Sequence, residues 1–196
     1  MTVTAGDPAE NAAPDAGAGT RRRYRTVVVA AEWALVLLAA IGTAVLVRNY
    51  VGQTFWIPTA SMAPTLAVDD RVVIDKLSYR FREPGRGDIV VFRAPARSDL
   101  AGSDLIKRVV ALPGEKISVR SGRVYIDGRQ LREPYLPPSA RSFDFLPFTV
   151  PEGRYFLMGD NRTVSNDSRI FGPVRREDIV GRAMIRIWPF SRLGTL

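Results

Sequence analysis

Ser61 is a candidate nucleophile in a chain that contains no histidine and no cysteine. It lies between Pro58 and Pro64, which restrict the backbone on either side of it. A serine nucleophile needs a base, and histidine is the usual one. If Ser61 is catalytic, its base must therefore be a carboxylate, an amine or a group borrowed from another molecule. On its position alone Ser61 also fits an ordinary turn serine, because an isolated serine is weak evidence for catalysis.

Lys107 is the amine that the pattern favours as this base. It lies in the run Asp104–Val110. The alternation of a β-strand places Leu105, Lys107 and Val109 on one face of this run, whereas Arg108 faces the other way. A lysine among apolar neighbours loses solvation, which lowers its pKa from about 10.4 and lets it act as a general base. The alternative is an exposed lysine on an edge strand, which is the more common role of strand lysines.

A third stretch, Gly159–Arg169, is dense in turn-forming and hydrogen-bonding residues. Such a segment is usually a surface loop. It can also support a catalytic site, because Ser165 can hold a lysine amine by a hydrogen bond and Asp167 can pair with Arg169 to fix the loop. Both interpretations stay open from these residues alone.

The composition excludes several kinds of site. Without cysteine there are no disulfides, thiolate metal sites or cysteine nucleophiles, and without histidine most zinc sites and the Ser-His-Asp triad are excluded. We expect no metal and no cofactor. The net charge is +8. Part of this excess is an arginine cluster beside an apolar segment, so we interpret it as a topology signal and a solvated surface rather than a nucleic-acid-binding surface.

That apolar segment, residues 26–47, predicts a transmembrane anchor. Glu32 is its only charged residue, and about 20 apolar residues span a bilayer. Residues 1–25 predict a disordered cytoplasmic tail with four arginines near its end. By the positive-inside rule, a single-pass protein of the plasma membrane with its N-terminus inside and its later residues outside is expected. A cleaved signal peptide, which would have a shorter apolar core, and a buried helix are the alternatives.

After the anchor, short β-like runs alternate with turns. The pairs Ser121-Gly122 and Asp127-Gly128 predict two β-hairpins. For residues 48–196 we expect a mostly antiparallel, barrel-like β domain outside the membrane, with a small inserted subdomain at about residues 116–150. The expected strands are residues 71–77, 87–93, 104–112, 117–120, 123–126, 129–131, 154–158 and 179–188.

Four segments in order carry a family resemblance. Residues 58–66, 86–92, 106–115 and 159–174 resemble the ordered sequence boxes of bacterial type I signal peptidases, which are membrane-anchored serine proteases with a Ser-Lys dyad. Each segment alone is moderately specific, whereas four in order after an anchor are highly specific. The resemblance implies the fold that these enzymes share with LexA-type proteases.

The resemblance also implies roles for particular residues. Ser61 would be the nucleophile and Lys107 the general base. Thr59, which stands where the family usually has a serine, would form the oxyanion hole with the Ser61 N–H. Ser165 would orient the Lys107 amine. The other supporting residues would be Asp160, Arg162, Asp167 and Arg169, and the pockets for the small P1 and P3 residues would be lined by Ile57, Met62, Leu66 and Ile106.

The implied function is an endopeptidase that removes N-terminal signal peptides from exported preproteins, cleaving after small residues in an Ala-x-Ala pattern. Its partners would be these signal peptides and the phospholipid membrane, with no nucleic acid and no metal. A membrane-anchored β domain that binds without catalysis and a LexA-type self-cleaving protease stay open as alternatives. A Ser-x-x-Lys penicillin-recognising enzyme is excluded, because no serine of the chain has a lysine three residues later.

Overall fold

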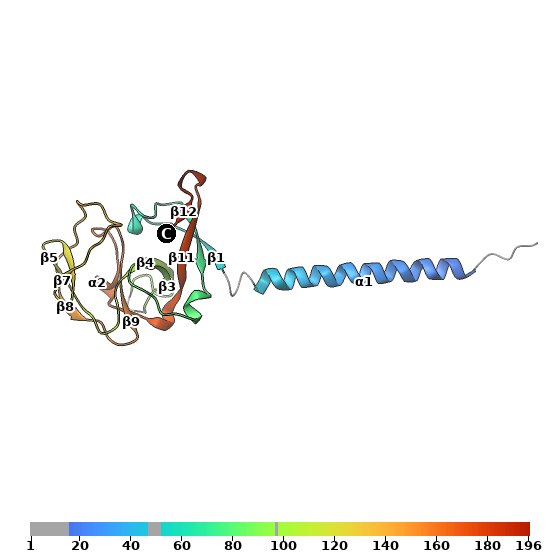
Figure 1. Cartoon of the computed structure of the whole chain (residues 1–196), viewed down its shortest axis with the longest axis horizontal. Helices are drawn as coiled ribbons and strands as arrows, with labels where there is room; N and C mark the ends of the chain where they lie inside the picture. Colours follow the sequence, from blue (N-terminus) through green and yellow to red (C-terminus); the bar gives the residue numbers. More distant parts are fainter. Residues whose placement is uncertain (1–15, 47–51, 97) are drawn as a thin grey trace, which may run out of the picture. The chain divides into compact units, whose positions relative to one another are not determined.

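The computed structural model describes residues 16–46, 52–96 and 98–196 of the chain. Contacts within the chain divide it into two compact units, Met1–Leu46 and Val47–Leu196. The first unit contains the helix α1 (Ala16–Leu46), drawn in blue in Figure 1. The second unit contains all of the described β-strands.

The helix α1 begins well before the predicted anchor, so residues 16–25 of the predicted tail are helical. Residues 1–15 of that tail and residue 47 of the predicted anchor lie outside the described residues. From residue 29 to residue 45 every side chain of the helix is exposed, including Trp33, Leu35 and Leu38. No helix in the described part of the chain has both the length and the apolar character that a bilayer span requires.

The second unit is built on an eight-stranded sheet. Its strands lie in the order β1-β2-β11-β3-β4-β9-β10, β12 pairs with β11, and all of these pairings are antiparallel. The strands are β1 (Gly52–Trp56), β2 (Arg71–Asp75), β3 (Ile89–Arg93), β4 (Asp104–Ala111), β9 (Arg154–Met158), β10 (Val174–Arg175), β11 (Ile179–Trp188) and β12 (Gly194–Thr195). The prediction of a mainly antiparallel β domain is confirmed.

The expected barrel is an open sheet instead. Its order ends in β1 on one side and β10 on the other, and no pairing between strands of the described residues joins these two ends. Register shifts along β11 bend and twist the sheet, as β-bulges do. This bending does not close the sheet into a barrel, because the last strand, β10, has two residues and both pair with β9. The strands β2, β3, β4, β9 and β11 of this sheet were expected from the sequence, whereas β1, β10 and β12 were not, and the pattern did not show where the sheet ends.

A second, four-stranded sheet has the order β7-β6-β5-β8. Figure 1 shows β5, β7 and β8 grouped on the side of the domain away from β1 and β11. Both predicted hairpins are confirmed: β5 pairs with β6 and β6 with β7, and Ser121 and Asp127 in the two turns have the positive φ angles that such tight turns require. The strands are β5 (Lys116–Arg120), β6 (Arg123–Ile126), β7 (Arg129–Gln130) and β8 (Phe145–Thr149).

Short helices connect the strands. One of them carries Ser61, and its residue Met62 belongs to a buried apolar cluster with Ile57, Leu66 and Ile106. Full burial of an apolar side chain of this size stabilises the fold by about 1.5–3 kcal/mol, so this cluster holds the segment around Ser61 against the sheet. The short helices are η2 (Ala60–Met62), η3 (Ser78–Arg80), α2 (Ser168–Phe171), η4 (Arg176–Asp178) and η5 (Phe190–Arg192).

The strand β4 has two different neighbours along its length. Residues Asp104–Arg108 pair with β3 on one side, whereas β9 pairs with the other side only from Arg108 onward. The outer edge of Asp104–Lys107 therefore has no strand partner among the described residues. Lys107 is the last residue of this unpaired edge.

Candidate active site

Ser61 lies at the centre of a loop that closes on itself. Two hydrogen bonds join the ends of this loop: the Ile57 N–H donates to the Asp70 carbonyl at 3.0 Å, and the Asp69 N–H donates to the Ile57 carbonyl at 2.9 Å. Inside it, the Leu66 N–H donates to the Met62 carbonyl at 2.9 Å. These bonds and the buried apolar side chains leave the half-buried Ser61 on a fixed turn, rather than on a free surface loop.

Lys107 reaches Ser61 from β4. Its Nζ atom donates to Ser61 Oγ at 2.8 Å and to the Ile106 carbonyl at 2.9 Å. The side chain is 3% exposed, so it is not the solvent-exposed edge lysine of the alternative interpretation. A serine hydroxyl and an amine, 46 residues apart in the sequence, thus lie within hydrogen-bond distance, as a nucleophile and its base must.

Burial changes the protonation of this amine. Loss of solvation lowers the pKa of Lys107 from 10.5 to about 8, and the negative charges of Asp167 and then Asp160 act in the opposite direction. Desolvation dominates because the charged amine has lost its water shell without gaining a direct carboxylate partner. The amine can therefore be neutral, and accept a proton, at mildly alkaline pH.

Thr59 is the second hydroxyl at Ser61. Its Oγ1 donates to Ser61 Oγ at 3.2 Å, and the residue is exposed. In this arrangement Ser61 Oγ accepts from both Thr59 and Lys107. The Thr59 hydroxyl rotates about a single bond, so it is free to turn from Ser61 toward a bound substrate.

Asp167 and Arg169 form the predicted brace. The Asp167 carboxylate is fully buried and accepts from Nε and Nη2 of Arg169 at 2.9 and 2.8 Å. It also accepts from the Arg169 N–H at 3.2 Å, which caps α2, and from the Gly159 N–H at 2.9 Å. The remaining guanidinium nitrogen of Arg169, Nη1, donates to the Arg162 carbonyl at 2.7 Å. One buried carboxylate thereby ties both ends of the Gly159–Arg169 loop together.

Asp160 joins the Gly159–Arg169 loop to β4, the strand that carries Lys107. Its carboxylate accepts from Nε and Nη2 of Arg108 at 2.9 and 2.7 Å, and from the Thr65 hydroxyl at 2.5 Å. The Arg108 guanidinium stacks on the Tyr135 ring, 3.9 Å from its centroid. A buried ion pair needs such additional bonds, because each charge has lost its water. Arg108 follows Lys107 directly, so this network fixes the position of the strand beside Lys107.

Ser165 lies in the site without the predicted contact. It is buried, and its hydroxyl has no hydrogen-bond partner among the described residues. It packs against Gly159, where an added Cβ would lie 2.5 Å from both the Ser165 Cβ and the Ser61 carbonyl oxygen. Gly159 is therefore a residue whose lack of a side chain lets the loop approach Ser61. The role of Ser165 in orienting Lys107 stays a prediction.

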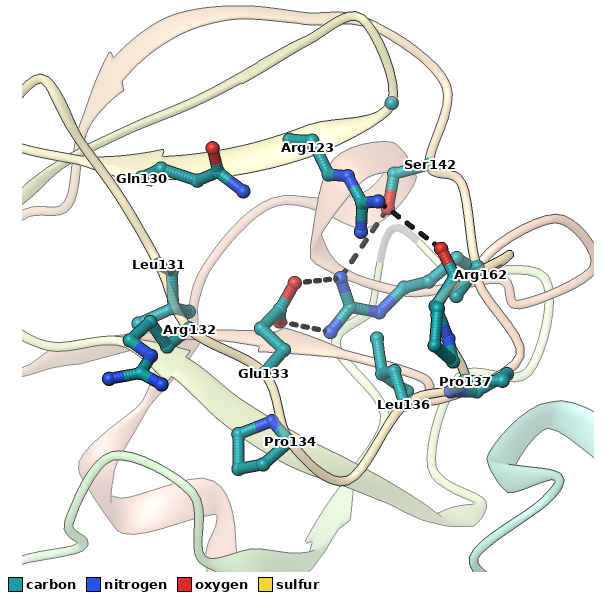
Figure 2. A pocket seen from close by; sticks show the side chains of 13 residues that line it. Arg123, Gln130, Leu131, Arg132, Glu133, Pro134, Leu136, Pro137, Ser142 and Arg162 are labelled. Atoms are coloured by element: carbon teal, nitrogen blue, oxygen red, sulfur yellow. Dashed lines mark hydrogen bonds and ion pairs between the residues drawn. The ribbon is translucent and has the colours of Figure 1, made fainter.

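Arg162 belongs to the same loop but its guanidinium lies in a different pocket. It pairs with Glu133, and Nη1 also donates to the Ser142 hydroxyl at 3.4 Å (Figure 2). The residue is 3% exposed. The structure therefore separates Arg162 from the group around Ser61 and Lys107, although its carbonyl is held by Arg169.

The four residues expected to line substrate pockets divide into two pairs. Ile57 and Ile106 line a cavity of about 60 Å³ that also contains Ser61 and Lys107. Met62 and Leu66 are completely buried in the apolar cluster below the loop and are not among the residues that line this cavity.

Several residues that hold the site were not found from the sequence. Asn161 donates from its N–H to the Ser61 carbonyl at 3.0 Å and from its side chain to the Ala60 carbonyl at 3.2 Å. From the C-terminal part, Arg186 donates to the Thr65 carbonyl at 2.8 Å and pairs with the buried Asp70. Arg192 pairs with Asp70 as well. The one available signal for Arg108 in the sequence was the pair of adjacent basic residues, Lys107 and Arg108, inside an apolar run.

Comparisons with known proteins give the family of this chain. A family profile described as "Signal peptidase, peptidase S26" matches residues 30–188. A probable signal peptidase I-1 of Synechocystis sp. is 43% identical over 167 residues, which cover 82% of this chain and 84% of that protein. A probable signal peptidase I-2 of the same organism is 40% identical over 169 residues, covering 84% and 76%.

A solved structure is similar over part of the chain. The crystal structure of a signal peptidase I from Enterococcus faecalis is 35% identical, with a TM-score of 0.45, and covers 52% of this chain and 97% of that one. In the described part of this chain, no group of three or more acidic side chains is placed to hold a metal ion. The profile match over most of the chain, together with relatives at 40–43% identity, shows that this chain belongs to the signal peptidase family, peptidase S26.

Proposed function

We propose that this chain is a signal peptidase that removes N-terminal signal peptides from exported preproteins, with Ser61 as nucleophile and Lys107 as general base. The observation that carries the proposal is the contact of 2.8 Å between Lys107 Nζ and Ser61 Oγ, made by an amine whose burial lowers its pKa to about 8. No histidine is needed in such a pair, because a desolvated lysine can take the proton of the serine.

The reaction runs in two halves. Neutral Lys107 takes the hydroxyl proton of Ser61 while Ser61 Oγ bonds to the carbonyl carbon of the residue before the cleaved bond. The Lys107 ammonium then gives this proton to the leaving amine, the C–N bond breaks, and the signal peptide stays on Ser61 as an ester. Lys107 next takes a proton from water, the hydroxide attacks the ester, and Ser61 leaves with the proton back from Lys107.

The oxyanion of each half is stabilised by the Ser61 N–H and the Thr59 hydroxyl. Ser61 lies in the first turn of η2, and N–H groups at the start of a helix have no partner within that helix. Thr59 turns its hydroxyl from Ser61 Oγ to the carbonyl oxygen of the substrate. Donors that are aimed at a developing negative charge are worth roughly 10²–10³ in kcat each.

The substrate binds as an added strand along Asp104–Lys107, whose outer edge has no partner among the described strands. The adjacent cavity of about 60 Å³ is far below the usual range of about 300–1,000 Å³ for ligand pockets, so it favours a small side chain. Cleavage after small residues, as in Ala-x-Ala, follows from this size. Ile57 and Ile106 contact the substrate, and Met62 and Leu66 support them from below.

The remaining residues position the dyad. Ser165 orients the Lys107 amine toward Ser61, which would also give the Ser165 hydroxyl a hydrogen-bond partner. Asp167 and Arg169 fix the loop that carries Ser165, and Asp160 fixes the strand of the base through Arg108.

The membrane is the second partner. We propose that residues 26–47 anchor the chain as a single span of the cytoplasmic membrane, with the N-terminus inside and the β domain outside. The exposed apolar side chains of residues 29–45 support this, because a solvated surface of that kind is unfavourable outside a lipid or protein environment. Arg21, Arg22, Arg23 and Arg25 give the orientation. A cleavage site that emerges from the bilayer would then meet Ser61 close to the membrane.

The test is cleavage of a preprotein with an Ala-x-Ala site, read by mass in detergent or lipid. Wild-type protein should cleave after the final alanine, and Ser61→Ala and Lys107→Ala should lose this activity. Ser139→Ala and Lys116→Ala are matched controls, since both residues are exposed and lie outside the site. If folded wild-type protein leaves the preprotein intact, an anchored binding domain becomes the better account. If either dyad variant cleaves normally, the assignment of that residue is wrong.

A further inference from the structure

A second pocket lies in the part of the domain that contains the four-stranded sheet. Its volume is about 440 Å³, and Figure 2 shows it from close by. One wall comes from the hairpin of β6 and β7, another from the loop Glu133–Ser142, and Arg162 enters from the loop that supports the active site. No step of the proposed mechanism uses it.

The charge of this pocket is positive. It is lined by Arg123, Arg132 and Arg162, and by one carboxylate, Glu133. That carboxylate is already satisfied, because it accepts from both terminal nitrogens of Arg162 and from the Tyr135 hydroxyl. Arg123 and Arg132 therefore carry two positive charges that the pocket does not balance.

Several donors in the pocket lack acceptors. Arg162 is 97% buried, since its exposed fraction is 3%, and its Nε atom has no partner among the described residues. A buried donor without an acceptor is unfavourable, so an acceptor that enters the pocket would relieve that cost. The side chains of Gln130 and Arg132 make no hydrogen bond or ion pair with another described residue. Arg123 makes one, from Nη2 to the Pro138 carbonyl at 3.2 Å.

Part of the pocket wall is apolar and stiff. Leu131 and Leu136 line it, and the three prolines Pro134, Pro137 and Pro138 limit the backbone freedom of one side. A preformed pocket with apolar walls and a few unpaired polar groups is the usual form of a ligand site, and this volume is within the usual range of about 300–1,000 Å³.

We propose that this pocket binds a carboxylate, with Arg123 and Arg132 as the charged contacts. Where the carboxylate is carried on an extended peptide, the Gln130 amide contacts the peptide main chain. Charge, unpaired donors and apolar walls together favour this chemistry over a neutral or cationic ligand. Two sources supply it: an acidic side chain in the mature segment of a preprotein, or a free carboxylate in solution. The first source rests on the proposed function, whereas binding itself does not.

The position of Arg162 links the pocket to the active site. Its carbonyl is held by Arg169, which also holds Asp167 in the loop around Ser61 and Lys107. A carboxylate bound beside Arg162 therefore fixes the same loop from its opposite side. An acidic residue in the mature segment would act as a specificity element, recognised away from the cleaved bond.

The experiment is calorimetric titration of the full-length Ser61→Ala protein in detergent. This variant is used because it lacks the proposed nucleophile and should not cleave the peptides during the titration. The probes are acetyl-Ala-Glu-Glu-Ala-amide, its Gln-Gln counterpart, and sodium succinate. We expect the acidic peptide to bind at least about tenfold more tightly than the neutral one, since each charge-assisted hydrogen bond contributes about that factor. Arg123→Gln and Arg132→Gln should each weaken it by a similar factor. Arg129→Gln is the matched control, because Arg129 is a neighbouring exposed arginine of β7 that does not line the pocket.

The outcomes separate the two sources and the two proposals. Weaker binding of succinate than of the peptide supports a peptide source, and equal binding supports a free carboxylate. Equal binding of the acidic and neutral peptides, or equal losses in the Arg129 control, overturns the pocket proposal. A cleavage assay with wild-type protein is run in parallel. If the Ser61→Ala protein binds the acidic and neutral peptides equally while wild-type protein cleaves a preprotein normally, this inference is rejected and the proposed function is not.

Discussion

Replacement of Lys107 by methionine should change how the stability of the fold depends on pH. The two side chains are similar in length, but only lysine must lose a proton or its hydration on burial. Burial lowers the pKa of Lys107 from 10.5 to about 8. Below about pH 8 the amine is charged in both the folded and the unfolded protein, so the free energy of unfolding is lowered by the full cost of desolvating the charged amine. Above about pH 10.5 it is neutral in both, and the cost is absent.

The magnitude follows from the difference between the two pKa values. One pH unit corresponds to about 1.4 kcal/mol, so the interval from 10.5 to about 8 corresponds to about 3 kcal/mol. The unfolded chain binds more protons within this interval, and the stability of the wild-type protein therefore rises with pH across it. The methionine variant lacks this rise. The stability that this variant loses through the missing contacts with Ser61 and Ile106 is the same, to first order, at every pH.

Urea unfolding of wild-type and Lys107→Met protein in detergent, from pH 7 to pH 10.5, measures this difference. Other groups that titrate here, mainly tyrosines, are the same in both proteins and cancel in the comparison. The wild type should gain about 3 kcal/mol relative to the variant as the pH rises. A difference that stays constant over this range would refute a lowered pKa for Lys107 and the neutral base with it.

Three other substitutions test the surrounding contacts. Gly159→Ala places a Cβ 2.5 Å from the Ser61 carbonyl and should lower kcat at least about tenfold without unfolding the domain, and normal cleavage would contradict the close approach. Arg108→Met leaves the buried Asp160 without its bidentate partner and should cost about 3–5 kcal/mol in urea unfolding, whereas a change below about 1 kcal/mol would argue against a buried pair. Thr59→Val should lower kcat by about 10²–10³ at unchanged KM while Thr59→Ser keeps activity, and equal rates would exclude the hydroxyl from the oxyanion hole.

The sequence predicts the parts of this fold that depend on local pattern. Ser121-Gly122 and Asp127-Gly128 require positive φ angles, and both turns form the expected hairpins. The run of β4 is apolar enough to be a buried strand, and Lys107 is buried in it. Periodicity within a strand does not show the partners of that strand, so the open end of the sheet at β10 could not be predicted.

The site was only partly visible for the same reason. Alternation places Arg108 on the face opposite Lys107, and on a strand exposed on one side that face would meet water. Both faces of this strand are buried, and Arg108 instead meets Asp160 from a loop 52 residues away. The bonds from Arg186 and Arg192 to the segment after Ser61 join residues more than 100 positions apart. Such contacts depend on the tertiary arrangement, which no local pattern contains.

The pH dependence of acylation tests the central claim most directly. A single-turnover reaction of excess enzyme with a preprotein, from pH 6 to pH 10, measures the first half of the reaction alone. With a pKa of about 8, the neutral amine is present at roughly one tenth of its maximum at pH 7 and at about half at pH 8. The rate should rise in that proportion and level off above about pH 9. A rate that is already at its maximum at pH 6 would contradict Lys107 as the base of Ser61.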